Sequence, residues 1–299
     1  MAVPSPALAP AQILERASIL SARFAKTAAH HDRTAAFPFA NFEALHEASL
    51  LNLTLARRWG GHEAGVELAA GVIDRIAQGE PSTALVLAMH YIYHALPRLT
   101  AAWDGPAYDR MCDEARAGVA LVNVMRVEPE LGTPSRGGLP ATTGTAVPGG
   151  WRVSGHKLYS TGSPALAWFI TWGRTAGEDP QVGWFAIPRD AGGWRIEETW
   201  DHMGMRATGS HDLILEDVFI PQEYALELRR PKEWFPPDPT QMTWNNLVIA
   251  ALYSGVAKAA RTWLVRYLHE RVPSNLGAAL ATLPRMQSAV GEIEALLFT

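Results

Sequence analysis

The hydrophobic pattern changes period twice along this chain, and the resulting order of segments limits the folds open to it. Residues 1–120 carry apolar side chains at helical spacing. Residues 121–230 hold short β-rich runs between glycines and prolines, and an alanine-rich helical pattern follows residue 231. Helices, then strands, then helices lack the βαβ alternation of Rossmann and TIM-barrel proteins, so those two folds are not expected.

Local spacing and turn residues give the expected elements. Helices are expected over residues 13–24, 39–51, 63–78, 82–96 and 103–116. Strands are expected over residues 151–153, 168–172, 182–187, 194–196 and 213–220, and short strands with regular punctuation predict a small sandwich or barrel. A proline-rich linker over residues 231–242 is expected to precede helices over residues 243–271 and 284–298.

Composition and charge narrow the possible partners. The chain has a net charge of -4 at pH 7, whereas nucleic acids and anionic membranes select basic surfaces. One cysteine, Cys112, allows no internal disulfide and no multi-cysteine metal site. The N-terminus lacks the pattern of a signal peptide, and no run approaches the roughly 20 apolar residues of a membrane helix. We therefore expect a cytoplasmic protein with no nucleic-acid, membrane or metal partner.

Two clusters of reactive side chains favour structural roles. Ser210, His211 and Asp212 are consecutive in a strand-like run, where neighbours point to opposite faces, so a Ser–His–Asp relay is not expected. His90 and His94 share a helix face, but the glutamate of a zinc-protease motif and a third ligand are not evident. We expect these histidines to pack between helices.

Three stretches of the β region carry the remaining polar motifs, and neither kind of glycine-rich phosphate loop is present. The stretches are residues 127–133 (VEPELGT), 155–161 (GHKLYST) and 204–221 (GMRATGSHDLILEDVFIP). In this order, between helical segments, they resemble motifs of the acyl-CoA dehydrogenase family. The last motif is the most specific, and the resemblance covers nearly the whole chain.

The resemblance implies an α+β fold, mainly α, with three domains. They are an N-terminal α-helical domain over residues 1–120, a flavin-binding β-barrel over residues 121–230, and a C-terminal helical domain over residues 231–299 that is part of a four-helix bundle. The apolar tail Leu296–Phe298 has no cap, which predicts an incomplete bundle and a C-terminally short member. Uncovered apolar helices need a partner surface, so a homotetramer or dimer is expected.

The resemblance also implies FAD, bound in an extended form. Tyr159 takes the place of an aromatic residue beside the flavin ring, and Thr161 that of a hydroxyl donor near its reactive nitrogen. Arg271 and Gln287 align with residues that touch the adenosine diphosphate part of FAD on a neighbouring subunit. The full set of expected cofactor-binding residues is Val124, Met125, Arg126, Val127, Thr133, Tyr159, Ser160, Thr161, Arg271 and Gln287.

The family reaction is α,β-dehydrogenation of an acyl-CoA thioester, in which a carboxylate removes the α-proton and a hydride passes to the flavin. At the position that some members use for this base, the chain has Asn245, which is no useful proton acceptor. Thr243 and Asn246 replace the family's charged contacts to CoA. Most members carry the base near the end of the bundle, so either the base lies beyond residue 299 or the chemistry differs, and no catalytic base is assigned. Two alternatives stay open: a flavin-dependent monooxygenase acting on a small aromatic or sulfur compound, and a non-catalytic flavin-binding member.

Overall fold

The computed structural model describes every residue except 1–7, 101–102, 132–137, 235, 237 and 299. Helices come first: α1 (Pro10–Thr34), α2 (Phe39–Glu47), α3 (Val66–Gly79), α4 (Pro81–Thr100) and α5 (Pro106–Ala117). Glu80 caps α4, because its carboxylate accepts hydrogen bonds from the main-chain N–H groups of Ser82 (3.2 Å) and Thr83 (2.5 Å). Helix α2 ends before residue 51, because Ser49 takes a left-handed backbone conformation (φ 59°).

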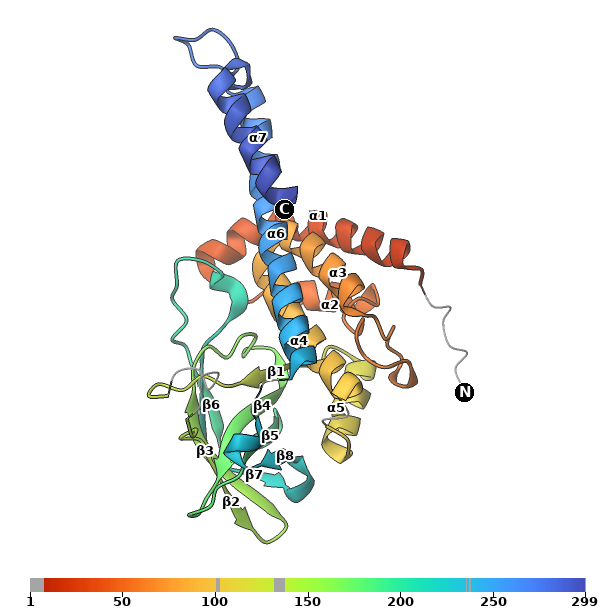
Figure 1. The fold of residues 1–299 in the computed structure, drawn as a ribbon, viewed down its shortest axis with the longest axis vertical. Helices are drawn as coiled ribbons and strands as arrows, with labels where there is room; N and C mark the ends of the chain where they lie inside the picture. The colour runs from red at the N-terminus through yellow and green to blue at the C-terminus, as the bar shows by residue number, and fades with distance from the viewer. Residues whose placement is uncertain (1–7, 101–102, 132–137, 235, 237, 299) are drawn as a thin grey trace.

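One sheet follows the N-terminal helices (Figure 1). Its strands are β1 (Leu121–Met125), β2 (Thr143–Val147), β3 (Gly150–Lys157), β4 (Leu166–Thr175), β5 (Val182–Pro188), β6 (Trp194–Glu197), β7 (Asp212–Pro221) and β8 (Ala225–Arg229). The order across the sheet is β6-β7-β3-β2-β4-β5-β8, and β1 pairs with β4 in parallel. Strands β1, β2 and β8 are additional to the expected set.

The expectation of a closed barrel is wrong. Among the described residues, β6 and β8 end the sheet and do not pair with each other. Strand β6 is short, and its alternate residues Arg195 and Glu197 are exposed charges. Charged side chains on an edge strand discourage further pairing, so the sheet stays open. The helical N-terminal part, the middle sheet and the C-terminal helices agree with the expected fold class.

Helix α4 is the central helix of the molecule, packed against α3, α6 and β1 (Figure 1). His90 and His94 are both buried on it, with ring centroids 4.5 Å apart. The main-chain N–H of Val122 donates to Nδ1 of His90 (3.3 Å), which fastens the helix to β1. The pair therefore packs in the core, as the sequence predicts.

The C-terminal helices are α6 (Pro239–Glu270) and α7 (Pro284–Phe298). Helix α6 begins earlier than expected, because Asp238 accepts hydrogen bonds from its first N–H groups and so caps it. Its first half lies so close to α3 that a Cβ on Gly255 would lie 2.3 Å from the carbonyl oxygen of Asp74. Its second half and α7 form a hairpin that stands away from the body (Figure 1) and exposes Trp263 and Phe298.

Within the described part of the chain, no helix combines the length and the apolar character needed to cross a membrane.

We expect acid to destabilise the fold through His94. Burial lowers the pKa of this imidazole from 6.5 to about 4, so protons bind the unfolded chain more tightly. Stability that is present above pH 6.5 is therefore lost as the pH falls toward 4, by about 3 kcal/mol. Denaturant titrations at neutral and acidic pH should show this loss in the wild type and a smaller one in His94→Leu. The exposed His30→Leu is the control, and an unchanged acid slope in His94→Leu would contradict this account.

Candidate active site

A cavity of about 1060 Å³ lies between the end of α4, the sheet and the start of α6. Its lining is unusually rich in aromatic rings, which come from five separate parts of the chain. These residues are Tyr93, Trp103, Trp172, Trp184 and Trp234. Concave sites with mainly apolar walls and a few polar groups are where small molecules bind, so this cavity is the candidate active site.

The aromatic rings of the cavity form one continuous cluster. Trp172 on β4 and Trp184 on β5 are cross-strand partners, with ring centroids 4.6 Å apart. The ring of Trp234 contacts Trp172 at 4.6 Å, and Trp103 contacts Trp184 at 6.4 Å. Tyr93 stacks on Trp103 with the planes 11° apart. Most of these rings meet edge to face, so the wall of the cavity presents both ring faces and ring edges.

Charged groups line the cavity beside this cluster. The guanidinium carbon of Arg126 lies 5.7 Å from the ring centroids of both Trp172 and Trp184, within the range of cation–π attraction. Glu227 forms an ion pair with Arg229. Burial raises the pKa of the Glu227 carboxyl, and the charge of Arg229 opposes that change.

The remaining carboxylates of the lining already have partners. Asp238 accepts main-chain N–H groups of α6, and Glu233 accepts the N–H of Arg230 (3.1 Å). Asn245 also lines the cavity and presents an amide there. Among the described lining residues, every carboxylate therefore has a hydrogen bond or an ion pair.

A second surface adjoins the cavity, and we call it the Tyr159 strip. Two hydrogen bonds bring its two segments together: Leu158 N–H donates to the carbonyl of Val127 (3.0 Å), and the Asn123 side chain donates to the carbonyl of Thr161 (2.9 Å). The strip consists of the partly exposed residues Val124, Val127, Tyr159 and Thr161. It therefore combines apolar side chains, the aromatic ring of Tyr159 with its phenolic hydroxyl, and the hydroxyl of Thr161.

Tyr159 is held in an unusual position on this strip. Its backbone is left-handed (φ 55°), and its side chain is 54% exposed. The ring lies 6.1 Å from Trp200 and 6.2 Å from His202, measured between centroids. A strained backbone at an exposed aromatic residue is a feature found at binding sites. The Thr161 hydroxyl lies 2.9 Å from that of Ser210.

Arg206 secures the loop that carries Trp200 and His202. Its Nε donates to the carbonyl of Asp32 at the end of α1 (2.9 Å). Its Nη1 donates to the carboxylate of Asp201 (3.0 Å) and to the carbonyl of His202 (2.8 Å). The arginine of the most specific motif thus joins this loop to the N-terminal helices.

The consecutive residues 210–212 form no catalytic relay. The Ser210 hydroxyl bonds that of Thr208 (2.7 Å), and the His211 ring accepts a main-chain N–H. Asp212 binds the His156 ring (2.7 Å) rather than that of its neighbour. The three side chains therefore bind different partners and not one another.

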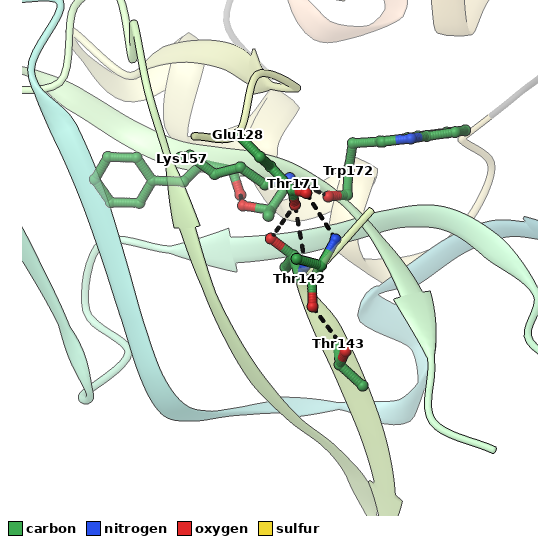
Figure 2. A network of polar contacts seen from close by, with 8 residues as sticks. Glu128, Thr142, Thr143, Lys157, Thr171 and Trp172 are labelled. Carbon is green, nitrogen blue, oxygen red and sulfur yellow. Dashed lines mark hydrogen bonds and ion pairs between the residues drawn. The ribbon is translucent and has the colours of Figure 1, made fainter. Parts of the chain in front are cut away.

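A buried ion pair fixes the segment between β1 and β2 (Figure 2). The ammonium of Lys157 lies 2.7 Å from Glu128 and also donates to the carbonyl of Trp172, and both charged side chains are inaccessible to solvent or nearly so. Glu128 further accepts hydrogen bonds from Thr142 N–H (3.0 Å), Thr142 hydroxyl (2.6 Å) and Ala141 N–H (2.6 Å). Burial lowers the pKa of Lys157 to about 8, against the opposing charge of Glu128.

The structure distributes the expected cofactor-binding residues over several places. Arg126 lines the cavity, Met125 and Ser160 are buried, and Thr133 lies outside the described residues. Arg271 follows the last residue of α6 and Gln287 lies on α7, in the hairpin that stands away from the sheet (Figure 1). Within one chain, Arg271 and Gln287 therefore do not lie at the Tyr159 strip. Their expected contact with FAD on a neighbouring subunit stays a prediction.

The aromatic cluster is the feature that sequence reasoning missed. A signal for part of it exists, because Trp172 and Trp184 both fall within expected strands. Their pairing depends on strand register, which the hydrophobic pattern of each strand does not specify by itself.

Comparison with known proteins identifies the family. The model of the acyl-CoA dehydrogenase middle domain matches residues 126–218, and that of the N-terminal domain matches residues 15–100. YdbM of Bacillus subtilis, which bears the name of an acyl-CoA dehydrogenase, is 34% identical over 95% of this chain and 72% of its own length. This chain belongs to the acyl-CoA dehydrogenase family.

Other relatives with this family fold carry the names of oxygenases and related enzymes. An indole-3-acetate monooxygenase of Pseudomonas putida is 28% identical over 81% of this chain and 58% of its own length. KijD3, solved with FMN and a dTDP-linked amino sugar, is 26% identical and has a TM-score of 0.81, covering 99% of this chain and 71% of KijD3. Family membership therefore leaves the reaction type open.

We expect the ion pair to be essential to the fold around the site. Lys157→Met leaves the Glu128 carboxylate buried without a cation, so chemical denaturation should show a loss of about 3–5 kcal/mol. The double variant Glu128→Gln/Lys157→Met removes both charges and should recover part of that loss. If the single and double variants are equally stable, the unpaired charge is not the cause.

Proposed function

We propose that this protein is a flavin-dependent oxidoreductase that holds the flavin ring against the Tyr159 strip. The valines suit the apolar end of the ring system, and the Thr161 hydroxyl suits its polar edge. The strip and the cavity meet on one segment, since Arg126 lines the cavity between Val124 and Val127. Substrate in the cavity therefore lies next to the cofactor.

We further propose that the reaction is monooxygenation of a small aromatic compound. The observation that carries this proposal is the continuous aromatic wall of the cavity. Reduced flavin supplies two electrons and two protons, one atom of dioxygen enters the substrate, and the other leaves as water. The protein's part is to orient a flat substrate between aromatic rings and to exclude bulk water.

Dehydrogenation of an acyl-CoA is the second candidate, supported by the similarity to YdbM. It needs a base, and Glu227 is the cavity-lining carboxylate whose pKa burial raises, which suits proton abstraction. The ion pair with Arg229 and the missing charges at Thr243 and Asn246 count against it.

A colourless purified protein would favour the non-catalytic alternative.

Two experiments separate the two reactions. Under anaerobic conditions, acyl-CoA compounds should leave the yellow oxidised flavin unchanged if the protein is an oxygenase. With reduced flavin supplied in air, consumption of oxygen should rise when an aromatic substrate is added and yield a hydroxylated product. Bleaching of the flavin by an acyl-CoA, without oxygen, would overturn the monooxygenase proposal and support dehydrogenation.

Thr161→Ala tests where the flavin binds. Loss of a hydroxyl donor at the ring should shift the absorption maximum of bound flavin and weaken its binding about tenfold. Thr161→Ser keeps the hydroxyl and should behave like the wild type. Normal spectra and occupancy in Thr161→Ala would remove the flavin from the strip. Heat release followed by chromatography identifies the flavin, because FAD is the family expectation whereas KijD3 was solved with FMN.

Acyl-CoA as substrate and a homotetramer or dimer stay predictions. The apolar side chains exposed on the hairpin, such as Trp263 and Phe298, support association with another surface.

A further inference from the structure

Arg126 is unlike the other charged groups that line the cavity. It is half-buried, and its Nε is shielded from solvent without a hydrogen-bond partner among the described residues. In the described part of the chain, no carboxylate forms an ion pair with it, whereas Arg229 in the same lining is paired with Glu227. Its contacts are instead the faces of Trp172 and Trp184, each 5.7 Å away. A partly desolvated guanidinium with ring contacts alone keeps its hydrogen-bonding capacity for a ligand.

A second donor beside Arg126 is also unused. The indole Nε1 of Trp172 is buried and bonds to no other residue that the structure describes, and the residue is 5% exposed. Figure 2 shows this ring directed away from the Lys157–Glu128 network, and the ring lines the cavity. Buried donors without acceptors are rare in folded proteins and call for a partner. Two such donors on neighbouring side chains suggest one acceptor with several lone pairs.

The negative charges of the lining do not neutralise Arg126. Glu227 is compensated by Arg229, and Asp238 and Glu233 accept main-chain N–H groups on exposed segments. The buried Glu128, on the same segment as Arg126, is matched by Lys157. An anion bound at Arg126 would therefore meet a guanidinium that no described carboxylate binds directly and that is set among aromatic rings.

We propose that the cavity selects a planar aromatic anion, with its carboxylate or sulfonate on Arg126 and its ring against the tryptophan wall. A guanidinium presents a planar fork of N–H donors that matches the oxygens of such groups. The apolar rings recognise the flat body, and their low polarity strengthens the ionic contact. This inference rests on the proposed function in placing the substrate in the cavity, but it concerns binding and not turnover.

The test uses the flavin-loaded protein and calorimetric titration with three probes of one shape. They are 2-naphthoate, naphthalene-2-sulfonate and the neutral 2-naphthamide. The wild type should bind both anions at least about tenfold more tightly than the amide, since hydrogen bonds to charged groups are the stronger ones. Equal affinity for all three probes would overturn the proposal without any variant.

Variants then assign the selectivity to Arg126. Arg126→Met should weaken binding of both anions about 10–100-fold and change that of the amide by less than about threefold. Arg126→Lys keeps the charge and should recover part of the loss. Lys26→Met removes an exposed positive charge from α1, outside the cavity lining, and should change none of the affinities. Equal effects of Arg126→Met and Lys26→Met would mean that net charge alone is responsible.

Three further outcomes have definite meanings. If Arg126→Met weakens the binding of FMN as much as that of the anions, Arg126 belongs to the cofactor and the inference is wrong. If anions bind selectively but no oxygen is consumed with any of them, the monooxygenase proposal fails and the anion site stands. Oxygen consumption with neutral aromatics alone would overturn the anion site and leave the monooxygenase proposal in place. If Arg126→Met does not fold, Arg126→Gln replaces it as the neutral variant.

Discussion

The buried ion pair between Lys157 and Glu128 fixes the chain segments that meet at the candidate active site. Removing two charges from water is expensive, and their mutual attraction compensates only when the other donors and acceptors are satisfied as well. Here Thr142 and Ala141 donate hydrogen bonds to the carboxylate of Glu128. The ammonium of Lys157 donates a further hydrogen bond to the carbonyl of Trp172. The pair thus joins the segment after β1 to both β3 and β4 at a single buried point. A shift of any of these three elements would leave a buried charge without its partner.

That junction explains why the strip and the cavity have a fixed relationship. The segment that carries Glu128 also carries Arg126 and Val127. Lys157 immediately precedes the turn that presents Tyr159 and Thr161. Because the two charged residues are locked together, the aromatic and hydroxyl groups of the strip are positioned relative to the guanidinium in the cavity. A reaction between a bound cofactor and a bound substrate depends on such fixed distances.

Local patterns made the order of elements and the family motifs predictable, whereas features that depend on register or on distant pairing were not. Helical spacing locates α4 because its apolar positions lie within one segment, and Pro81 marks its start. Closure of a barrel depends on whether β6 and β8 pair with each other, and the residue pattern within either strand does not predict that pairing. Trp103 and Trp234 lie about 130 positions apart in the chain, so their presence in one cavity follows only from the folded topology. Strand β1 escaped prediction because its run of apolar residues does not alternate.

The open sheet bears directly on the chemistry. Strand β8 lies at the edge of the sheet, and its residues Glu227 and Arg229 line the cavity. Just beyond it, the indole N–H of Trp234 donates to the carbonyl of Val182 (2.9 Å), so the chain covers this end of β5 with an aromatic ring. In a closed barrel, β8 would pair with another strand on its free side, and the space next to it would be filled by that strand. Strand β8, whose outer edge stays unpaired among the described residues, therefore lines the cavity together with Arg126, and the exposed charges of β6 discourage the pairing that would close the sheet.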